Sequence, residues 1–147
     1  MGFFYTITLK MNIQKKLAKS FQLFQEKKYT EAIKNLDEII RFQPHNYDAY
    51  SNKAIILINI NKQQDAKICF EKALSISFDK KIANNFVKLL INQADWLNAQ
   101  RVNDQLINKF GIILDYQKNK ALILRGLKKY NQAIEIYKDL IKKNLND

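Results

Sequence analysis

The chain has 147 residues, 47% of them hydrophobic, which fits a single domain with a core of useful size. It contains one proline, three glycines and one cysteine, so it has little loop material and no disulfide framework. A formal net charge of +11 favours acidic partners, but only three of the 25 basic residues are arginine, the better phosphate ligand.

The positive charge gathers at both ends of the chain. Residues 1–28 carry a net charge of +5, residues 29–114 of +2 and residues 115–147 of +4. Two interpretations stay open: the basic ends contact something acidic, or an AT-rich genome has enriched Lys, Asn and Ile. No apolar run reaches the ~18 residues of a membrane-spanning helix. With the lone Cys69, this predicts an intracellular, reducing location, cytoplasmic by default, with an organelle or cytoskeletal assembly as the alternative.

Residues 1–12 form an apolar and basic stretch with partly strand-like alternation. We expect this stretch to be an N-terminal arm that precedes one folded domain over residues 13–147.

Four alanines then recur at nearly constant spacing. Ala32, Ala66, Ala99 and Ala133 lie 34, 33 and 34 residues apart, and three of them follow an aromatic residue by three positions. The phrase around Ala54 returns around Ala121, two periods later. A fixed period near 34 is typical of helical repeat arrays, whose units bury their apolar faces on one another.

The period divides the domain into four repeats, 13–46, 47–79, 80–113 and 114–147, each predicted to be a pair of amphipathic helices. Pro44 is expected to end the first pair, and Gly111 to close the third with a left-handed cap. The expected helices are 13–27 with 29–42, 47–61 with 63–77, 80–94 with 96–110, and 114–128 with 130–144.

This pattern resembles the tetratricopeptide repeat, in which a small residue in the first helix is followed by an aromatic residue and an alanine in the second. The second repeat matches this pattern at Ala54 and Ala66, and the fourth repeat matches it at Ala121, Tyr130 and Ala133. The first and third repeats match it less well. The resemblance covers residues 13 to 144 and implies an all-α fold, a right-handed superhelical α-solenoid of four helix-turn-helix repeats.

The resemblance also implies that the first helix of each pair lines a concave groove. Three asparagines at one repeat position can pair with a peptide backbone, although Asn is abundant throughout this chain. The N-terminal half of the groove is apolar and the C-terminal half basic, which suits a ligand with an apolar and an acidic stretch. The candidate groove residues are Asn52, Asn85, Asn119, Leu17, Phe21, Phe24, Ile55, Ile58, Lys81, Lys88, Lys118 and Arg125.

Both ends of the array have more apolar residues than one buried stripe needs. We expect them to dock against another copy or a larger assembly; fraying ends with loose apolar residues are the alternative. The candidate docking residues are Phe3, Phe4, Tyr5, Ile136 and Leu140.

The sequence contains no recognisable catalytic, cofactor or metal site. Its only histidine, His45, has no cysteine, second histidine or acid cluster near it in the sequence, and there is no glycine-rich phosphate loop. A small-molecule substrate is therefore not expected.

We therefore predict a non-enzymatic scaffold that binds an extended or helical protein segment in its groove and docks by its ends within a larger complex. The alternative is a basic adaptor that contacts nucleic acid, an anionic membrane or an acidic polymer such as a microtubule.

Overall fold

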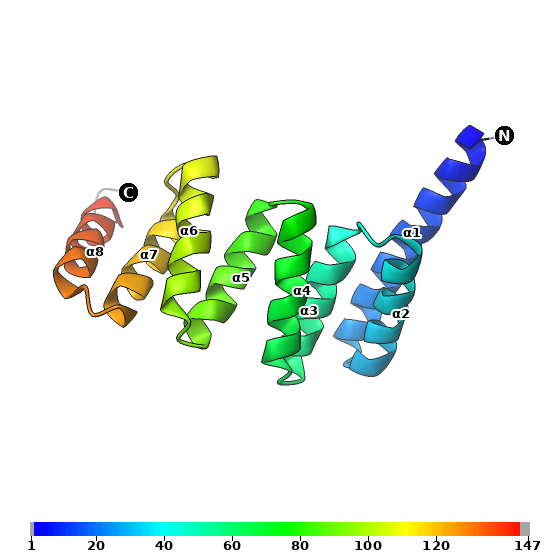
Figure 1. Cartoon of the computed structure of the whole chain (residues 1–147), viewed down its shortest axis with the longest axis horizontal. Coiled ribbons are helices and arrows are strands. Elements are labelled where there is room, and N and C mark those ends of the chain that lie inside the picture. The colour runs from blue at the N-terminus through cyan, green and yellow to red at the C-terminus, as the bar shows by residue number, and fades with distance from the viewer. Residues whose placement is uncertain (1, 145–147) are drawn as a thin grey trace. The chain divides into compact units, whose positions relative to one another are not determined.

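The structure, a computed structural model, describes residues 2–144 and the side chains of residues 12–143. Over this range every regular element is a helix, which confirms the all-α helical repeat (Figure 1). The helices are α1 (Gly2–Gln25), α2 (Tyr29–Phe42), α3 (Tyr47–Asn59), α4 (Gln63–Ile76), α5 (Lys80–Asn92), α6 (Trp96–Phe110), α7 (Leu114–Gly126) and α8 (Tyr130–Asn144).

The helices form two compact units, Met1–Phe78 with α1 to α4 and Asp79–Asp147 with α5 to α8. We call them unit 1 and unit 2. In unit 1 each helix packs on the next, and α1 also contacts α3. Unit 2 repeats this arrangement, with α5 also contacting α7. Each unit therefore brings its two first helices together on one side.

The four repeating alanines, which we call the alanine ladder, lie at the centre of the helix pairs. Ala32, Ala66 and Ala99 are fully buried and Ala133 nearly so. The small residue expected in the first helix is buried in three pairs, at Ser20, Ala54 and Ala121. The third pair has the larger Val87 there, which is also buried. Small side chains at this position allow two helices of a pair to approach closely.

The first helix of each pair ends two residues earlier than the periodicity predicts. The predicted last residue instead adopts a positive φ of 56–64° in every pair. The residue after it donates its backbone N–H to the carbonyl five residues back, at N···O distances of 2.8–2.9 Å. These are Schellman turns, which close a helix by backbone hydrogen bonds. The positive-φ residues are Lys27, Asn61, Ala94 and Lys128.

The N-terminal stretch departs from the expectation of a separate arm. Residues 2–12 are helical and continuous with the predicted first helix, in one α1 of 24 residues. Alternation over so few residues does not outweigh the absence of a helix breaker between Phe3 and Gln25.

Gly111 also differs in detail from the predicted cap. It follows α6 with φ 83° and ψ −179°, so its backbone is extended at positive φ and is not left-handed helical. This region is essentially restricted to glycine. Gly111 therefore turns the chain sharply out of α6 toward α7.

Candidate protein-binding surfaces

The predicted apolar groove residues of unit 1 lie on α1 and α3, which contact each other. Leu17 and Phe24 are half-buried and pack against the core cluster that includes Leu23 and Leu36. Phe21, one turn from Leu17, is 59% exposed. On α3, Ile55 and Ile58 are half-buried. Unit 1 thus has an apolar face from which one aromatic ring projects into solvent.

The predicted basic groove residues of unit 2 are all exposed. Lys81 and Lys88 lie on α5, and Lys118 and Arg125 lie on α7. Because α5 and α7 contact each other, the structure brings these four cations onto neighbouring helices of one unit. This surface attracts negative charge at close range, and salt weakens the attraction.

The three repeat asparagines do not share one environment. Asn52 and Asn85 are half-buried, but Asn119 is only 5% exposed. The Asn119 amide donates to Oδ1 of Asn84 at 2.8 Å, which links α7 to α5. Burial leaves Asn119 little surface for a ligand, so in the fourth helix pair this position serves helix packing. The sequence analysis did not identify Asn84, because a hydrogen bond across 35 residues has no local signal.

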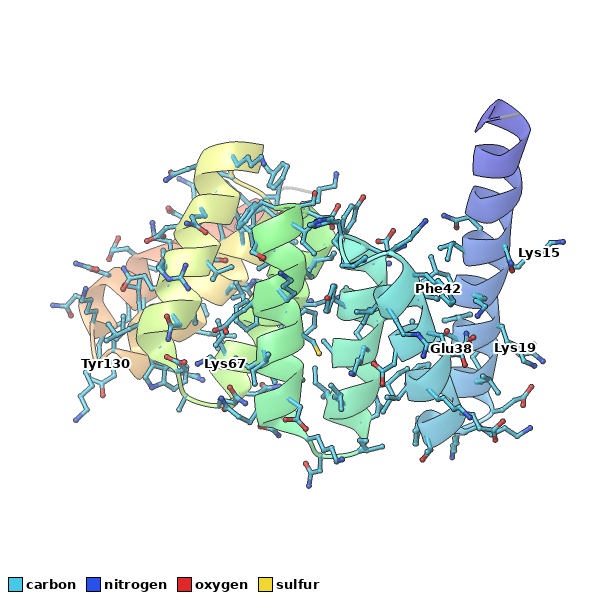
Figure 2. All side chains as sticks on the ribbon, turned by 45° about the vertical axis from the view of Figure 1, so that its right-hand side comes forward. Lys15, Lys19, Glu38, Phe42, Lys67 and Tyr130 are labelled. Carbon is cyan, nitrogen blue, oxygen red and sulfur yellow. The ribbon has the colours of Figure 1, made fainter. Side chains whose placement is uncertain are left out.

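Two lysines on first helices form ion pairs with α2. Lys16 binds Glu38 at 2.8 Å, and Lys53 binds Asp37 at 2.6 Å. The hydrogen bond from Lys16 holds the pKa of the Glu38 carboxyl below its usual value. Figure 2 shows Glu38 on the side of α2 that faces α1, whereas Lys15 and Lys19 project from α1 away from it. Part of the positive charge of unit 1 is therefore paired with acidic side chains of the same unit.

The docking residues predicted on α8 are not its most exposed apolar residues. Ile136 and Leu140 are half-buried, at helical spacing from the buried Ala133. Ile134 and Ile141 lie on another face and are exposed, as is Tyr130 at the start of the helix (Figure 2). Among the described helices, α8 packs on α7. The predicted docking side chains Phe3, Phe4 and Tyr5 lie outside those that the structure describes.

The buried position four residues after the repeating alanine is polar in the third pair. Asn103 is fully buried, and its amide donates to the Tyr116 carbonyl at 3.1 Å. Its Oδ1 has no hydrogen-bond partner among the described residues. The corresponding residues of the first two pairs are Leu36 and Phe70, both fully buried. Asn103 is therefore a polar defect between α6 and α7.

The titratable groups do not form a reactive cluster. Within the described residues, no three His, Cys, Asp or Glu side chains are placed to hold a metal ion. Cys69 is buried, and burial raises the pKa of its thiol. Burial likewise raises the pKa of Tyr116.

Comparison with known sequences identifies the repeat. The family pattern described as "Tetratricopeptide repeat" matches residues 47–80 and 116–146. Two helix pairs of this chain match the tetratricopeptide repeat. The matched segments correspond to the second and fourth helix pairs, the two that fit the resemblance best. No curated protein matches the sequence significantly.

Solved tetratricopeptide repeat structures share the fold. A tetratricopeptide repeat protein from Parabacteroides merdae superposes with a TM-score of 0.83 at 14% identity, over 93% of this chain and 54% of that one. MamA from Desulfovibrio magneticus gives 0.80 at 15% identity, over 92% and 77%. YrrB, described as "a TPR protein with an unusual peptide-binding site", gives 0.78 at 13% identity, over 97% and 74%. This chain thus spans about half of the first protein, and these identities establish the fold alone.

The tetratricopeptide repeat fold is that of a protein–protein interaction scaffold and is typically not enzymatic. Nucleic acid and acidic polymers gain no support as partners from these comparisons. Among the described helices, none combines the length and apolar character needed to cross a membrane.

Proposed function

We propose that this chain is a non-enzymatic scaffold that binds segments of other proteins on the first helices of its repeats. In unit 1 the segment contacts α1 and α3 through apolar side chains. In unit 2 a bound segment contacts α5 and α7 through its own acidic side chains. The observation that carries the proposal is Phe21, a ring 59% exposed beside the half-buried Leu17 and Phe24. Exposed aromatic residues beside partly buried apolar ones are common anchors in protein interfaces.

The charge of unit 2 supports a different ligand chemistry for that unit. The exposed cations of α5 and α7 are not matched by a similar set of exposed acids on the same faces. These cations are Lys81, Lys88, Lys118 and Arg125. An acidic segment gains from long-range attraction and then from contacts with the lysine side chains. Asn85 is half-buried on α5 and is the asparagine of this unit that we expect to contact the peptide backbone.

Peptide selection on the immobilised full chain tests the proposal. Random peptides displayed on phage are selected, synthesised with a fluorescent label, and titrated by fluorescence polarisation. We expect Phe21→Ser to weaken apolar peptides by about tenfold or more. Phe42→Ser is the matched control, because Phe42 is also an exposed phenylalanine of unit 1, 65% exposed, but lies on α2. Phe42 contacts Lys16 and Arg41 and lies outside the proposed surface.

The basic surface is tested with the acidic peptides from the same selection. The double variant Lys88→Glu/Lys118→Glu should weaken these peptides and leave the apolar ones unchanged. Equal binding of every selected peptide to wild type, Phe21→Ser and the double variant would rule out the first helices as the binding surface.

Docking by the ends within a larger assembly stays a prediction. The exposed Ile134 and Ile141 on α8 support it. Ile134→Ser/Ile141→Ser should leave the helical content unchanged and should abolish any self-association seen by sedimentation velocity. A wild-type chain that remains monomeric up to about 0.1 mM counts against docking to a second copy.

A further inference from the structure

One end of unit 2 exposes a run of apolar side chains. Ile112 and Ile113 connect α6 to α7, and with Leu114 at the start of α7 they are 46–68% exposed. The corresponding connection between α2 and α3 is polar, from Gln43 to Asn46. Surface connections are normally polar because solvent surrounds them. Three consecutive aliphatic residues here therefore indicate a contact that the isolated chain does not make.

Lysines lie at the same end of unit 2. Successive helices run in opposite directions, so α5 and α7 begin where α6 and α8 end (Figure 1). Among the described residues of these terminal turns and their caps, two are acids. One is Asp79, whose carboxylate accepts the backbone N–H groups of Lys81 and Ile82 as a helix cap. The other acid is Asp115. The lysines of the terminal turns are Lys80, Lys81, Lys109, Lys142 and Lys143.

We propose that this surface, which we call the lysine–isoleucine edge, binds an anionic phospholipid membrane. Ile112, Ile113 and Leu114 insert at the level of the headgroups and upper acyl chains, and the surrounding lysines contact lipid phosphates. A bilayer accepts apolar side chains of any shape, so the edge needs no complementary pocket. Lys109 already combines the two chemistries, since its ammonium lies over the Phe110 ring at 5.6 Å from the centroid.

The charge of the edge argues against a second copy as the occupant. Two such edges facing each other would bring ten lysines together, twice the five on each, against four acids. Like charges in contact oppose association. An acidic protein would satisfy the lysines, but it would also have to present an apolar surface shaped to three projecting side chains. An anionic bilayer supplies charge and apolar depth without that match.

Vesicle co-sedimentation of the full chain is the test. We expect binding to phosphatidylcholine vesicles that contain about 30% phosphatidylserine, and much weaker binding to pure phosphatidylcholine. Ile112→Ser/Ile113→Ser should reduce binding by about tenfold or more, because the apolar contribution is lost. Lys142→Glu/Lys143→Glu should reduce it by a similar factor, since each lysine contributes about fivefold near an anionic surface.

Leu97→Ser is the matched control. Leu97 is the most exposed large apolar residue described, at 73%, and it lies at the opposite end of α6 from the edge. Its substitution should leave vesicle binding unchanged. All these side chains are exposed, so circular dichroism should show the same helical content in every variant.

Fluorescence distinguishes insertion from adsorption. The native Trp96 lies at the start of α6, away from the edge, so brominated phosphatidylcholine in the anionic vesicles should not quench it. Ile112→Trp adds a second indole at the edge, and its emission should be quenched. Leu97→Trp should behave like the native chain.

Three results would overturn the proposal. The first is no binding to anionic vesicles. The second is binding that survives Ile112→Ser/Ile113→Ser unchanged, which would mean nonspecific adsorption of a basic protein. The third is a combination of two observations: a poly-glutamate peptide binds the edge as tightly as the vesicles do, and brominated lipid does not quench the emission of Ile112→Trp. This combination would assign the edge to an acidic protein.

Discussion

Asn103 combines complete burial with an unsatisfied carbonyl oxygen on its side chain. Leaving a buried acceptor without a partner costs about 1–3 kcal/mol. Asn103→Leu removes that oxygen and keeps the same branching and number of heavy atoms in the side chain, although the side chain becomes larger. Tyr116 keeps its helical hydrogen bond because it lies within α7. We expect the free energy of unfolding in urea to rise by about 1 kcal/mol.

Asn103→Ala separates this effect from packing, since it removes the same oxygen but leaves a cavity and should be destabilising. If Asn103→Leu is as destabilising as Asn103→Ala, the oxygen has a partner, such as a bound water, that stabilises the fold.

The Cys69 thiol should be unreactive in the folded chain. Burial restricts access and raises the pKa of the thiol, so little thiolate forms. Reaction with a disulfide reagent at neutral pH should be at least about tenfold slower than in Ile68→Cys/Cys69→Ala. Ile68 precedes Cys69 on α4 and is exposed, so it is the matched control. Equal rates would show that α4 opens locally on the time scale of the reaction.

The same raised pKa has a consequence at alkaline pH. The folded chain holds the thiol proton more tightly than the unfolded chain, so neither state ionises below the ordinary thiol pKa of about 8.5. Above that value the unfolded chain releases its proton first, and stability falls as pH rises. Cys69→Ala should lose less stability than wild type between about pH 8 and pH 10, measured by urea unfolding.

At this scale the sequence predicts burial better than it predicts contact. The four repeating alanines are buried as expected, since periodicity alone places them on the inner face of a helix. The environment of Asn119 was not predictable, because it depends on Asn84 from a different repeat. Which apolar face of α8 is more exposed was also not predictable, because it depends on the packing of α8 against α7.

The end of α7 packs closely on the start of α6. Gly126 ends α7 against the Trp96 ring at the start of α6, and a Cβ at that position would collide with the indole. Replacing glycine in a helix normally gains about 1 kcal/mol of propensity, but overpacking costs about 1–3 kcal/mol. We expect Gly126→Ala to be destabilising, by about 1 kcal/mol in urea unfolding.

A double-mutant cycle tests the cause. In the smaller background of Trp96→Leu, Gly126→Ala should be neutral or stabilising, because the ring is gone. A Gly126→Ala penalty that persists there would place its cause in the backbone of α7 and exclude a clash with Trp96.

The existence of every helix was predictable, but the ends of the first helices and the start of α1 were not. Every second helix begins and ends within a residue of its predicted bounds, since Pro44 and Gly111 mark two of the ends in the sequence. The first helices end early because Lys27, Asn61, Ala94 and Lys128 adopt a conformation that none of these residue types requires. The start of α1 was missed because short apolar runs do not separate helix from strand.

On the scale of the whole molecule, the net charge of +11 opposes folding through mutual repulsion. The described ion pairs, such as Lys28 with Glu26 and Lys138 with Glu135, are largely exposed and offset little of it. Salt screens this repulsion. We expect the melting temperature, followed by circular dichroism, to rise by a few degrees as sodium chloride increases from about 0.05 M to 0.5 M.

Vesicle binding over the same salt range should change in the opposite direction, since salt also screens the attraction between the lysines and anionic lipid. A melting temperature that falls with added salt would instead mean that the exposed ion pairs outweigh the repulsion.

The Schellman turns also bear on how such a chain can change over time. Each turn is closed by main-chain groups, and lysine, asparagine and alanine all occupy its positive-φ position. The turn therefore places almost no demand on the side chain it contains. Duplication, recombination or exchange of a whole helix pair would carry its turn intact, whatever residues had drifted there. Substitution to glycine at Lys27, Ala94 or Lys128 remains open as a route to a more stable chain, because only glycine adopts this conformation without steric cost.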